Sequence, residues 1–110
     1  MENRYSIEEK IVHIKEAILK HVPAKYIYLF GSYAYGEPEE HSDIDIYAVL
    51  PDHIEKERMH RIKIRRELAN INIFDVDLHL NNESSFNKRK HISRFEETIF
   101  EKGRLLYENP

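Results

Sequence analysis

Two aspartates lie two positions apart where a polar stretch gives way to apolar, β-branched residues, and they are the first candidates for chemistry. Asp43 and Asp45 are separated by Ile44, and no lysine or arginine adjoins them. On a strand, both side chains would leave the same face with their Cα atoms about 6.5–7 Å apart. Two such charges about 6 Å apart repel by roughly 3 kcal/mol at an effective dielectric near 20. A bound cation would offset this repulsion, and oxygen ligands favour Mg²⁺.

A third carboxylate on a neighbouring strand would turn this pair into a two-metal site for phosphoryl transfer. Asp77 is our candidate, because it lies in a later segment with alternating polar and apolar residues. Asp75, two residues earlier, is the alternative. A plain structural interpretation stays open for the first pair, since aspartate is common where a loop enters a strand. His79, on the same polar face as Asp77, is more often a hydrogen-bonded structural residue than a ligand when it stands alone.

A glycine and a serine follow an earlier apolar segment and supply groups that bind phosphate. Gly31 and Ser32 come directly after residues 26–30. A glycine lets the backbone approach phosphate closely, and amides with a hydroxyl can donate to the β- and γ-phosphates of a nucleotide. Alone, this pattern is more often a simple turn. Combined with the aspartates, it offers the phosphate donors and the cation ligands that an Mg·NTP complex requires.

The spacing of these motifs resembles the signature of the DNA polymerase β-like nucleotidyltransferase superfamily. The signature reads here as Gly31-Ser32, ten intervening residues, and Asp43-Ile-Asp45. The small size, the segment carrying Asp77 and the ending at 101–108 look like the minimal nucleotidyltransferase (MNT) branch. Members of this branch, the MntA-type antitoxins, are often found beside HEPN-domain toxins. The resemblance runs over about residues 26–108.

The resemblance implies a palm-like α/β (α+β) fold, with a small mixed sheet flanked by helices. It implies a Mg²⁺-dependent transfer of a nucleoside monophosphate, AMP from ATP, to an acceptor hydroxyl such as a tyrosine of a HEPN-type toxin. Gly31 and Ser32 would hold the triphosphate, and Asp43 and Asp45 would bind metal. Asp77 would bind metal or act as the base toward the acceptor. The active complex would hold two Mg²⁺ ions and release pyrophosphate.

One departure from the branch leaves two other functions open. Tyr35 precedes Gly36, where the branch commonly has arginine before its second glycine. Loss of that cation favours a non-catalytic antitoxin, which would neutralise its partner by complex formation, or a sensor that binds nucleotide without turnover. Larger superfamily members carry a second domain that 110 residues do not supply. We therefore expect a HEPN-type partner or a second copy of the chain to complete the site.

The elements that must position these residues can be read from periodicity and caps. Ser6 and Glu9 form a capping-box pattern ahead of an apolar stripe that ends at Pro23, which predicts a helix. Strands are expected at 26–30, 44–50 and 73–80. In the third strand Phe74, Val76, Leu78 and Leu80 should share one face, and Ile73, Asp75, Asp77 and His79 the other.

Two further helices and a last strand complete the pattern. A helix over 53–70 should begin at the cap Asp52 and lie on the surface. Its many basic residues usually mean a solvated face, and docking to an acidic partner surface or contact with phosphate is the alternative. A second capping box, Ser93 with Glu96, predicts a helix that ends at Gly103 in the left-handed conformation. A short strand follows at 105–107. This order describes one domain over 1–110 built on an α/β sheet.

Composition limits the partners. The chain has 17 basic and 20 acidic residues, a net charge of −3 and no cysteine. We therefore expect no general binding to nucleic acid, no disulfide and, given scattered histidines, no zinc site. The start lacks the apolar core of a signal peptide and no run is long enough to span a bilayer, so we expect a cytoplasmic protein. Of Tyr33 and Tyr35, we expect one to be buried.

Overall fold

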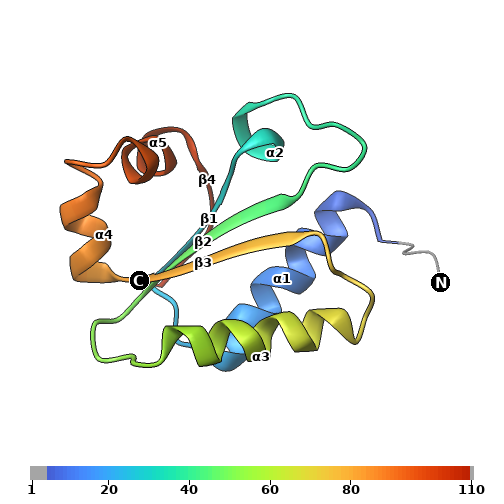
Figure 1. The fold of residues 1–110 in the computed structure, drawn as a ribbon, viewed down its shortest axis with the longest axis horizontal. Coiled ribbons are helices and arrows are strands. Elements are labelled where there is room, and N and C mark those ends of the chain that lie inside the picture. The colour runs from blue at the N-terminus through green and yellow to red at the C-terminus, as the bar shows by residue number, and fades with distance from the viewer. Residues whose placement is uncertain (1–4, 110) are drawn as a thin grey trace.

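The fold is a mixed sheet with helices on both faces, as the sequence predicts (Figure 1). A computed structural model of the chain describes residues 5–109. In chain order the elements are α1 Ile7–His21, β1 Tyr26–Phe30, α2 Ser32–Tyr35, β2 Ile44–Leu50, α3 Glu57–Ala69, β3 Val76–Asn82, α4 Glu83–Arg89, α5 Arg94–Lys102 and β4 Arg104–Glu108. The sheet order is β3-β2-β1-β4. Strands β2 and β3 run parallel, whereas β1 is antiparallel to both β2 and β4.

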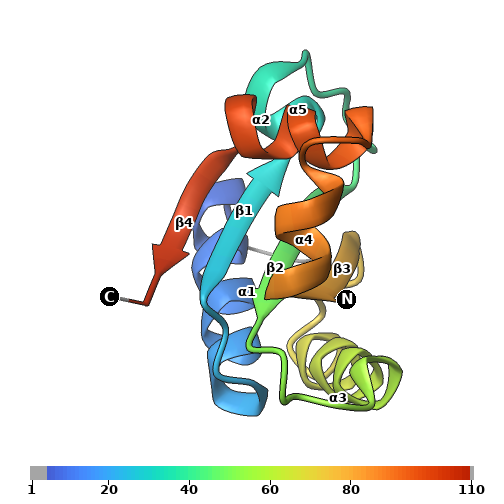
Figure 2. The ribbon, with the colours of Figure 1, turned by 90° about the vertical axis from the view of Figure 1, so that its left-hand side faces the viewer.

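The two faces of the sheet are covered to different extents. Helices α1 and α3 pack on one face, where Ile14, Ile18 and Leu68 join the large apolar core. Helices α4 and α5 cover part of the other face, where Tyr47 and Phe86 belong to a smaller cluster (Figures 1 and 2). Within residues 5–109 no helix has both the length and the apolar character needed to cross a bilayer.

The first helix begins as its sequence predicts. The backbone N–H of Glu9 donates to the Ser6 hydroxyl over 3.1 Å, and the Ser6 N–H donates to Glu9 Oε1 over 3.0 Å. This capping box satisfies two amides that the helix itself cannot pair. The strands expected at 26–30 and 44–50 have these same bounds in the structure.

The third strand begins later than predicted, which corrects the alternation assigned to its first residues. Ile73 is 2% exposed and Phe74 is 69% exposed, opposite to the predicted faces. The Ile73 N–H donates to the Leu68 carbonyl over 3.0 Å, which ties this residue to the end of α3. Ladder pairing starts only at Val76. From Val76 onward the predicted alternation is correct.

The predicted start of the basic helix is also wrong. Helix α3 begins at Glu57, after Lys56 in a left-handed conformation with φ 59°. Asp52 does not cap it. The Asp52 carboxylate instead accepts from the Ser84 N–H over 2.8 Å, at the start of α4. Periodicity did not reveal α2 or α4, because each is too short to show a helical repeat.

The second predicted capping box does not form. Ser93 precedes α5 but makes no side-chain cap hydrogen bond, and Glu96 points into the protein instead. Gly103 has φ −64°, so it is not the left-handed residue we predicted. A side chain there would overlap the Ile99 carbonyl oxygen, so close packing explains the glycine. The final strand is present over Arg104–Glu108.

Candidate active site

The parallel pairing of β2 and β3 places two of the predicted acids side by side. Asp45 pairs in register with Asp77, and the next pair on the same face is Tyr47 with His79. Neighbouring strands lie about 4.8 Å apart, so the two carboxylates share one small region of the sheet surface. Asp43 lies one residue before β2 and is exposed. The structure therefore brings Asp45 and Asp77 together, with Asp43 at the entrance to the strand.

The electrostatics of this region centre on Asp45. Its side chain is partly buried, and burial raises the pKa of the carboxyl. The negative charges of Asp77 and Asp43 raise that pKa further, and His79 acts in the opposite direction. A carboxylate held among like charges is most easily kept ionised when a cation is bound to it.

The Gly31 turn lies directly against the Asp45 carboxylate. Phe30, the last residue of β1, pairs with Asp45, and Gly31 follows with φ 73°. A Cβ atom at position 31 would overlap Asp45 Oδ2. Only glycine accommodates both this backbone conformation and the neighbouring carboxylate. Ser32 then begins α2, so the predicted phosphate-binding turn and the acid pair adjoin each other.

His79 is held against the third acid. Its Nε2 atom lies 3.1 Å from Asp77 Oδ2. The imidazole packs among three rings, with centroid distances of 5.6 Å to Phe30, 6.2 Å to Tyr47 and 5.5 Å to Phe95. These contacts restrict the imidazole and direct one nitrogen at the carboxylate. The alternating pattern placed His79 on the correct face, but the aromatic surroundings come from three other elements.

Asp75, the alternative third acid, does not join the site. Its Oδ2 atom lies 2.9 Å from Lys10 Nζ, and this lysine side chain is only 14% exposed. Asp75 precedes β3 and pairs with α1. Of the two aspartates that the sequence left open, Asp77 is the one beside Asp45.

A buried polar network lies next to the acids on the same face, and sequence reasoning missed it. Glu96 is 4% exposed, and its Oε2 atom accepts from the Tyr47 hydroxyl over 3.1 Å and from Arg89 Nε over 2.9 Å. Asn81 Nδ2 donates to the Tyr47 oxygen over 3.1 Å. Burial raises the pKa of Tyr47 to about 12. The network borders a hollow of about 360 Å³ that also reaches His79.

The donor set of the acid pair fits Mg²⁺. The ligands are carboxylate oxygens, and Mg²⁺ commonly takes one or two carboxylates and completes its octahedron with water and substrate phosphates. Within residues 5–109 no three histidine, aspartate or glutamate side chains are close enough to enclose a metal ion by themselves. Asp45 would hold the ion together with Asp43 at the entrance to β2, and Asp77 beside Asp45 would be a further ligand or a base.

The fold and this constellation define a nucleotidyltransferase domain, and sequence comparison agrees. The profile of the nucleotidyltransferase domain family matches residues 11–106. The chain belongs to this family. No curated protein is significantly similar to it in sequence.

Solved structures with the same fold include toxin-antitoxin proteins. A variant of the complex MntA-HpeT is 26% identical with a TM-score of 0.55, over 96% of this chain and 75% of that one. A toxin-antitoxin structure with AMP-PNP is 25% identical with a TM-score of 0.57, over 94% of this chain and 75% of that one. The MNT antitoxin complex with tri-AMPylated HEPN toxin from Shewanella oneidensis shares the fold at 21% identity and a TM-score of 0.50, over 91% and 73%.

Proposed function

We propose that this chain is a Mg²⁺-dependent nucleotidyltransferase that transfers AMP from ATP to a hydroxyl group and acts as an antitoxin. The observation that carries the proposal is the register pairing of Asp45 with Asp77, beside a turn that only Gly31 can form. This arrangement would set cation ligands next to phosphate donors. Family membership supports the class of reaction.

On the nucleotide side, the turn and the first two acids would position the triphosphate. The backbone and hydroxyl of Ser32 would donate to the β- and γ-phosphates, because the first amides of a helix have no partners within it. Asp43 and Asp45 would serve as metal ligands. When bound, Mg²⁺ would neutralise phosphate charge and polarise the α-phosphoryl group.

On the acceptor side, Asp77 would receive the proton of the attacking hydroxyl. The new bond forms between the acceptor oxygen and the α-phosphorus, and the bond to the β-phosphate oxygen breaks to release pyrophosphate. His79 lies 3.1 Å from one oxygen of Asp77. It would hold this carboxylate so that the other oxygen faces the hydroxyl. The hollow beside His79 leaves room for the acceptor to approach.

For the acceptor we propose a tyrosine of a HEPN-type toxin. The support comes from the related folds, which include an MNT antitoxin bound to a HEPN toxin that carries AMP groups. The Asp77 side chain is 52% exposed, so a partner that covers the site would exclude water from the reaction.

The test is incubation with labelled ATP, Mg²⁺ and a HEPN-domain partner. Asp45→Asn and Asp77→Asn should abolish transfer of label, whereas Asp75→Asn, which changes an acid outside the pair, should retain it. Transfer that persists in the first two variants would refute the mechanism.

A second candidate function is neutralisation by complex formation alone. Tyr35, which replaces the arginine common in the MNT branch, is 44% exposed at the end of α2. It brings no cation to the nucleotide side. Under this alternative, the triple variant Asp43→Asn, Asp45→Asn, Asp77→Asn should still neutralise the partner in cells. If this variant binds the partner yet fails to neutralise it, the alternative is wrong.

A third candidate, a nucleotide sensor, predicts binding without turnover. Calorimetry with ATP at millimolar Mg²⁺ should then show binding that Asp45→Asn abolishes, while labelled AMP is never transferred. If no heat of binding is seen, the sensor is excluded.

A further inference from the structure

Helix α3 carries a positive charge that contrasts with the rest of the chain. It has five cations and two glutamates, a net charge of +3, although the whole chain has a net charge of −3. The cations are Arg58, Arg61, Lys63, Arg65 and Arg66. A basic surface on an acidic protein is an electrostatic feature that a negatively charged partner would recognise.

These cations are not used by the fold. Glu67, on the same helix, is bound by α1 through Lys20 Nζ at 3.2 Å and His21 Nε2 at 3.1 Å. None of the five cations of α3 makes an ion pair with any residue in the range 5–109. Arg61 lines the hollow beside His79, whereas Arg65 and Arg66 line a different hollow and their charge is available to another molecule.

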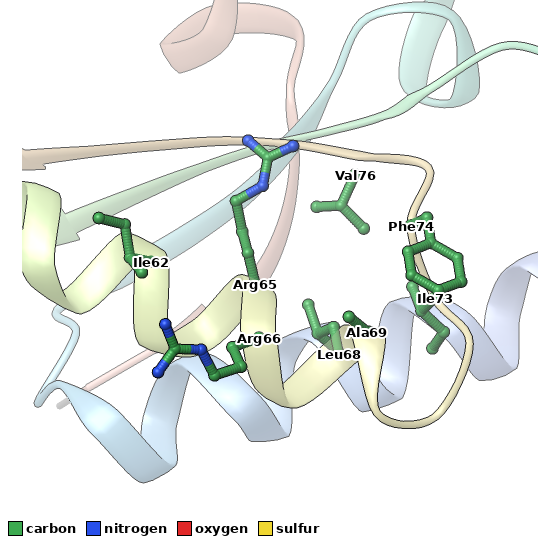
Figure 3. Close-up of a pocket in the computed structure, with 8 residues that line it drawn as sticks. All are labelled: Ile62, Arg65, Arg66, Leu68, Ala69, Ile73, Phe74 and Val76. Carbon is green, nitrogen blue, oxygen red and sulfur yellow. The ribbon is translucent and has the colours of Figure 1, made fainter.

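An apolar groove lies beside the basic surface, between α3 and the segment that enters β3. Its volume is about 390 Å³. Leu68 and Ile73 form a buried floor, whereas Ile62 is 39% exposed and Phe74 is 69% exposed. Figure 3 shows the Phe74 ring on the entering segment and Arg65 extending from α3 toward β3. An exposed apolar hollow with cations at its rim is typical of a protein interaction site.

The groove is separate from the acid pair. It opens at β3, which is an edge strand of the sheet. Asp45 and Asp77 lie on the face shared with Tyr47, whereas Leu68 and Ile73 belong to the core on the opposite face. A molecule in the groove would leave the candidate active site open.

We propose that this groove, formed by α3 and the start of β3, binds an acidic segment of a partner protein. One apolar side chain of that segment enters between Ile62 and Phe74, and carboxylates on either side of it meet Arg65 and Arg66. The choice of a peptide over a nucleic acid follows from the apolar floor, which a phosphate backbone cannot fill. Helix α3 has no Phe, Tyr or Trp among its cations, so it lacks the series of stacking rings of a single-strand binding surface, and Phe74 is the one aromatic residue of the groove.

The choice of a partner over a second copy of the chain follows from the acidic segments that the chain itself exposes. On α5 the exposed Phe100 lies between acids, but Lys90 Nζ already lies over its ring, 4.2 Å from the centroid. The loop over 37–40 carries three exposed glutamates, but it contains no large apolar side chain to enter the groove. Charge complementarity alone would leave Ile62 and Phe74 in contact with water. The occupant must therefore combine both kinds of side chain.

The test titrates the full chain into labelled synthetic peptides and follows fluorescence anisotropy at low salt. The first peptide is acidic with one central phenylalanine, the second has serine at that position, the third has lysine for each acid, and a fourth probe is a short single-stranded RNA. We expect the first peptide to bind at least about tenfold more tightly than the others, a difference of about 1.4 kcal/mol. No step involves ATP or the aspartates, so the outcome is independent of the proposed transfer reaction.

Variants locate the binding. The double variant Arg65→Glu, Arg66→Glu and the single variant Phe74→Ser should each weaken the first peptide about tenfold or more. The double variant Lys88→Glu, Lys102→Glu, which also reverses two charges at exposed positions but lies on α4 and α5, should change binding less than about twofold. All these residues are exposed, so circular dichroism should show unchanged folding.

Three results would overturn the proposal. The first is absence of binding up to millimolar peptide, or binding that the groove variants do not affect. The second is tighter binding to the RNA than to the acidic peptide with phenylalanine. The third is self-association in sedimentation that Arg65→Glu, Arg66→Glu abolishes, because the occupant would then be a second copy.

Discussion

Asp45→Asn should stabilise the folded protein, although the same change should abolish nucleotidyl transfer. Asparagine keeps the shape of the side chain and removes its charge. That charge is unfavourable because Asp45 is partly buried and because Asp77 and Asp43 repel it. His79 offsets this effect only in part. Sites built to hold a cation commonly show this conflict between stability and activity.

The magnitude follows from the register. Asp45 pairs with Asp77 on the adjacent strand, and we take their carboxylates to be about 6 Å apart. Their repulsion is then about 3 kcal/mol at an effective dielectric of 20 and about 0.7 kcal/mol in bulk water. The Asp77 side chain is 52% exposed, so water screens much of this interaction. We expect a gain of about 1 kcal/mol, which raises Tm by about 4 °C in a domain of this size.

The pH dependence has a definite sign. The pKa of Asp45 is higher in the folded state than its ordinary value of 3.8. Ionisation of Asp45 therefore lowers the free energy of unfolding. This loss is absent below the pKa of the unfolded state, grows as pH rises toward the pKa of the folded state, and is complete above it. The advantage of Asp45→Asn over the wild type should be complete at neutral pH and should disappear on acidification below pH 3.8.

Urea unfolding followed by circular dichroism in EDTA measures this difference. Asp75→Asn is the matched control, and it should destabilise the protein because it removes the carboxylate that pairs with Lys10 at 2.9 Å. Millimolar Mg²⁺ should stabilise the wild type and leave Asp45→Asn unchanged. The electrostatic reasoning is refuted if Asp45→Asn lowers the free energy of unfolding at neutral pH, or if both asparagine variants shift it in the same direction.

Three further variants test neighbouring parts of the site. Gly31→Ala should cost about 1–3 kcal/mol, because φ 73° with ψ −154° is a backbone conformation that essentially only glycine adopts. The overlap with Asp45 adds a further cost, which should shrink when Asp45 is also alanine. A double-mutant cycle by urea unfolding measures this coupling, and additive costs would contradict the overlap. Glu96→Gln should cost about 1–3 kcal/mol at neutral pH. Burial would raise the pKa of Glu96, but its hydrogen bonds outweigh burial and lower it below 4.5. The stabilisation by ionised Glu96 is therefore present above pH 4.5 and is lost as pH falls through the folded-state pKa. A cost of Glu96→Gln that does not change with pH would contradict this role. His79→Ala should lower kcat about tenfold or more with little change in KM, and His79→Asn should retain part of the wild-type kcat. Steady-state kinetics measure both constants, and an effect on KM alone would exclude a role of His79 in orienting Asp77.

The sequence by itself determined the local features of this protein. The capping box at Ser6, the strand bounds at 26–30 and 44–50, and the spacing from Gly31 to Asp45 all depend on residues near each other in the chain. Periodicity and caps are local physical signals, so they can be read without a structure. The family signature is local in the same sense.

The tertiary structure decided which side chains meet. Asp77 rather than Asp75 became the neighbour of Asp45, because Ile73 is tied to the end of α3 and the ladder begins only at Val76. Glu96 does not form the predicted capping box, because its carboxylate accepts hydrogen bonds from the Tyr47 hydroxyl on β2 and from Arg89 on α4. Asp45 and Tyr47 lie far in sequence from Asp77 and Glu96, and Arg89 belongs to a different helix from Glu96. The energies of these contacts depend on burial that no local pattern encodes.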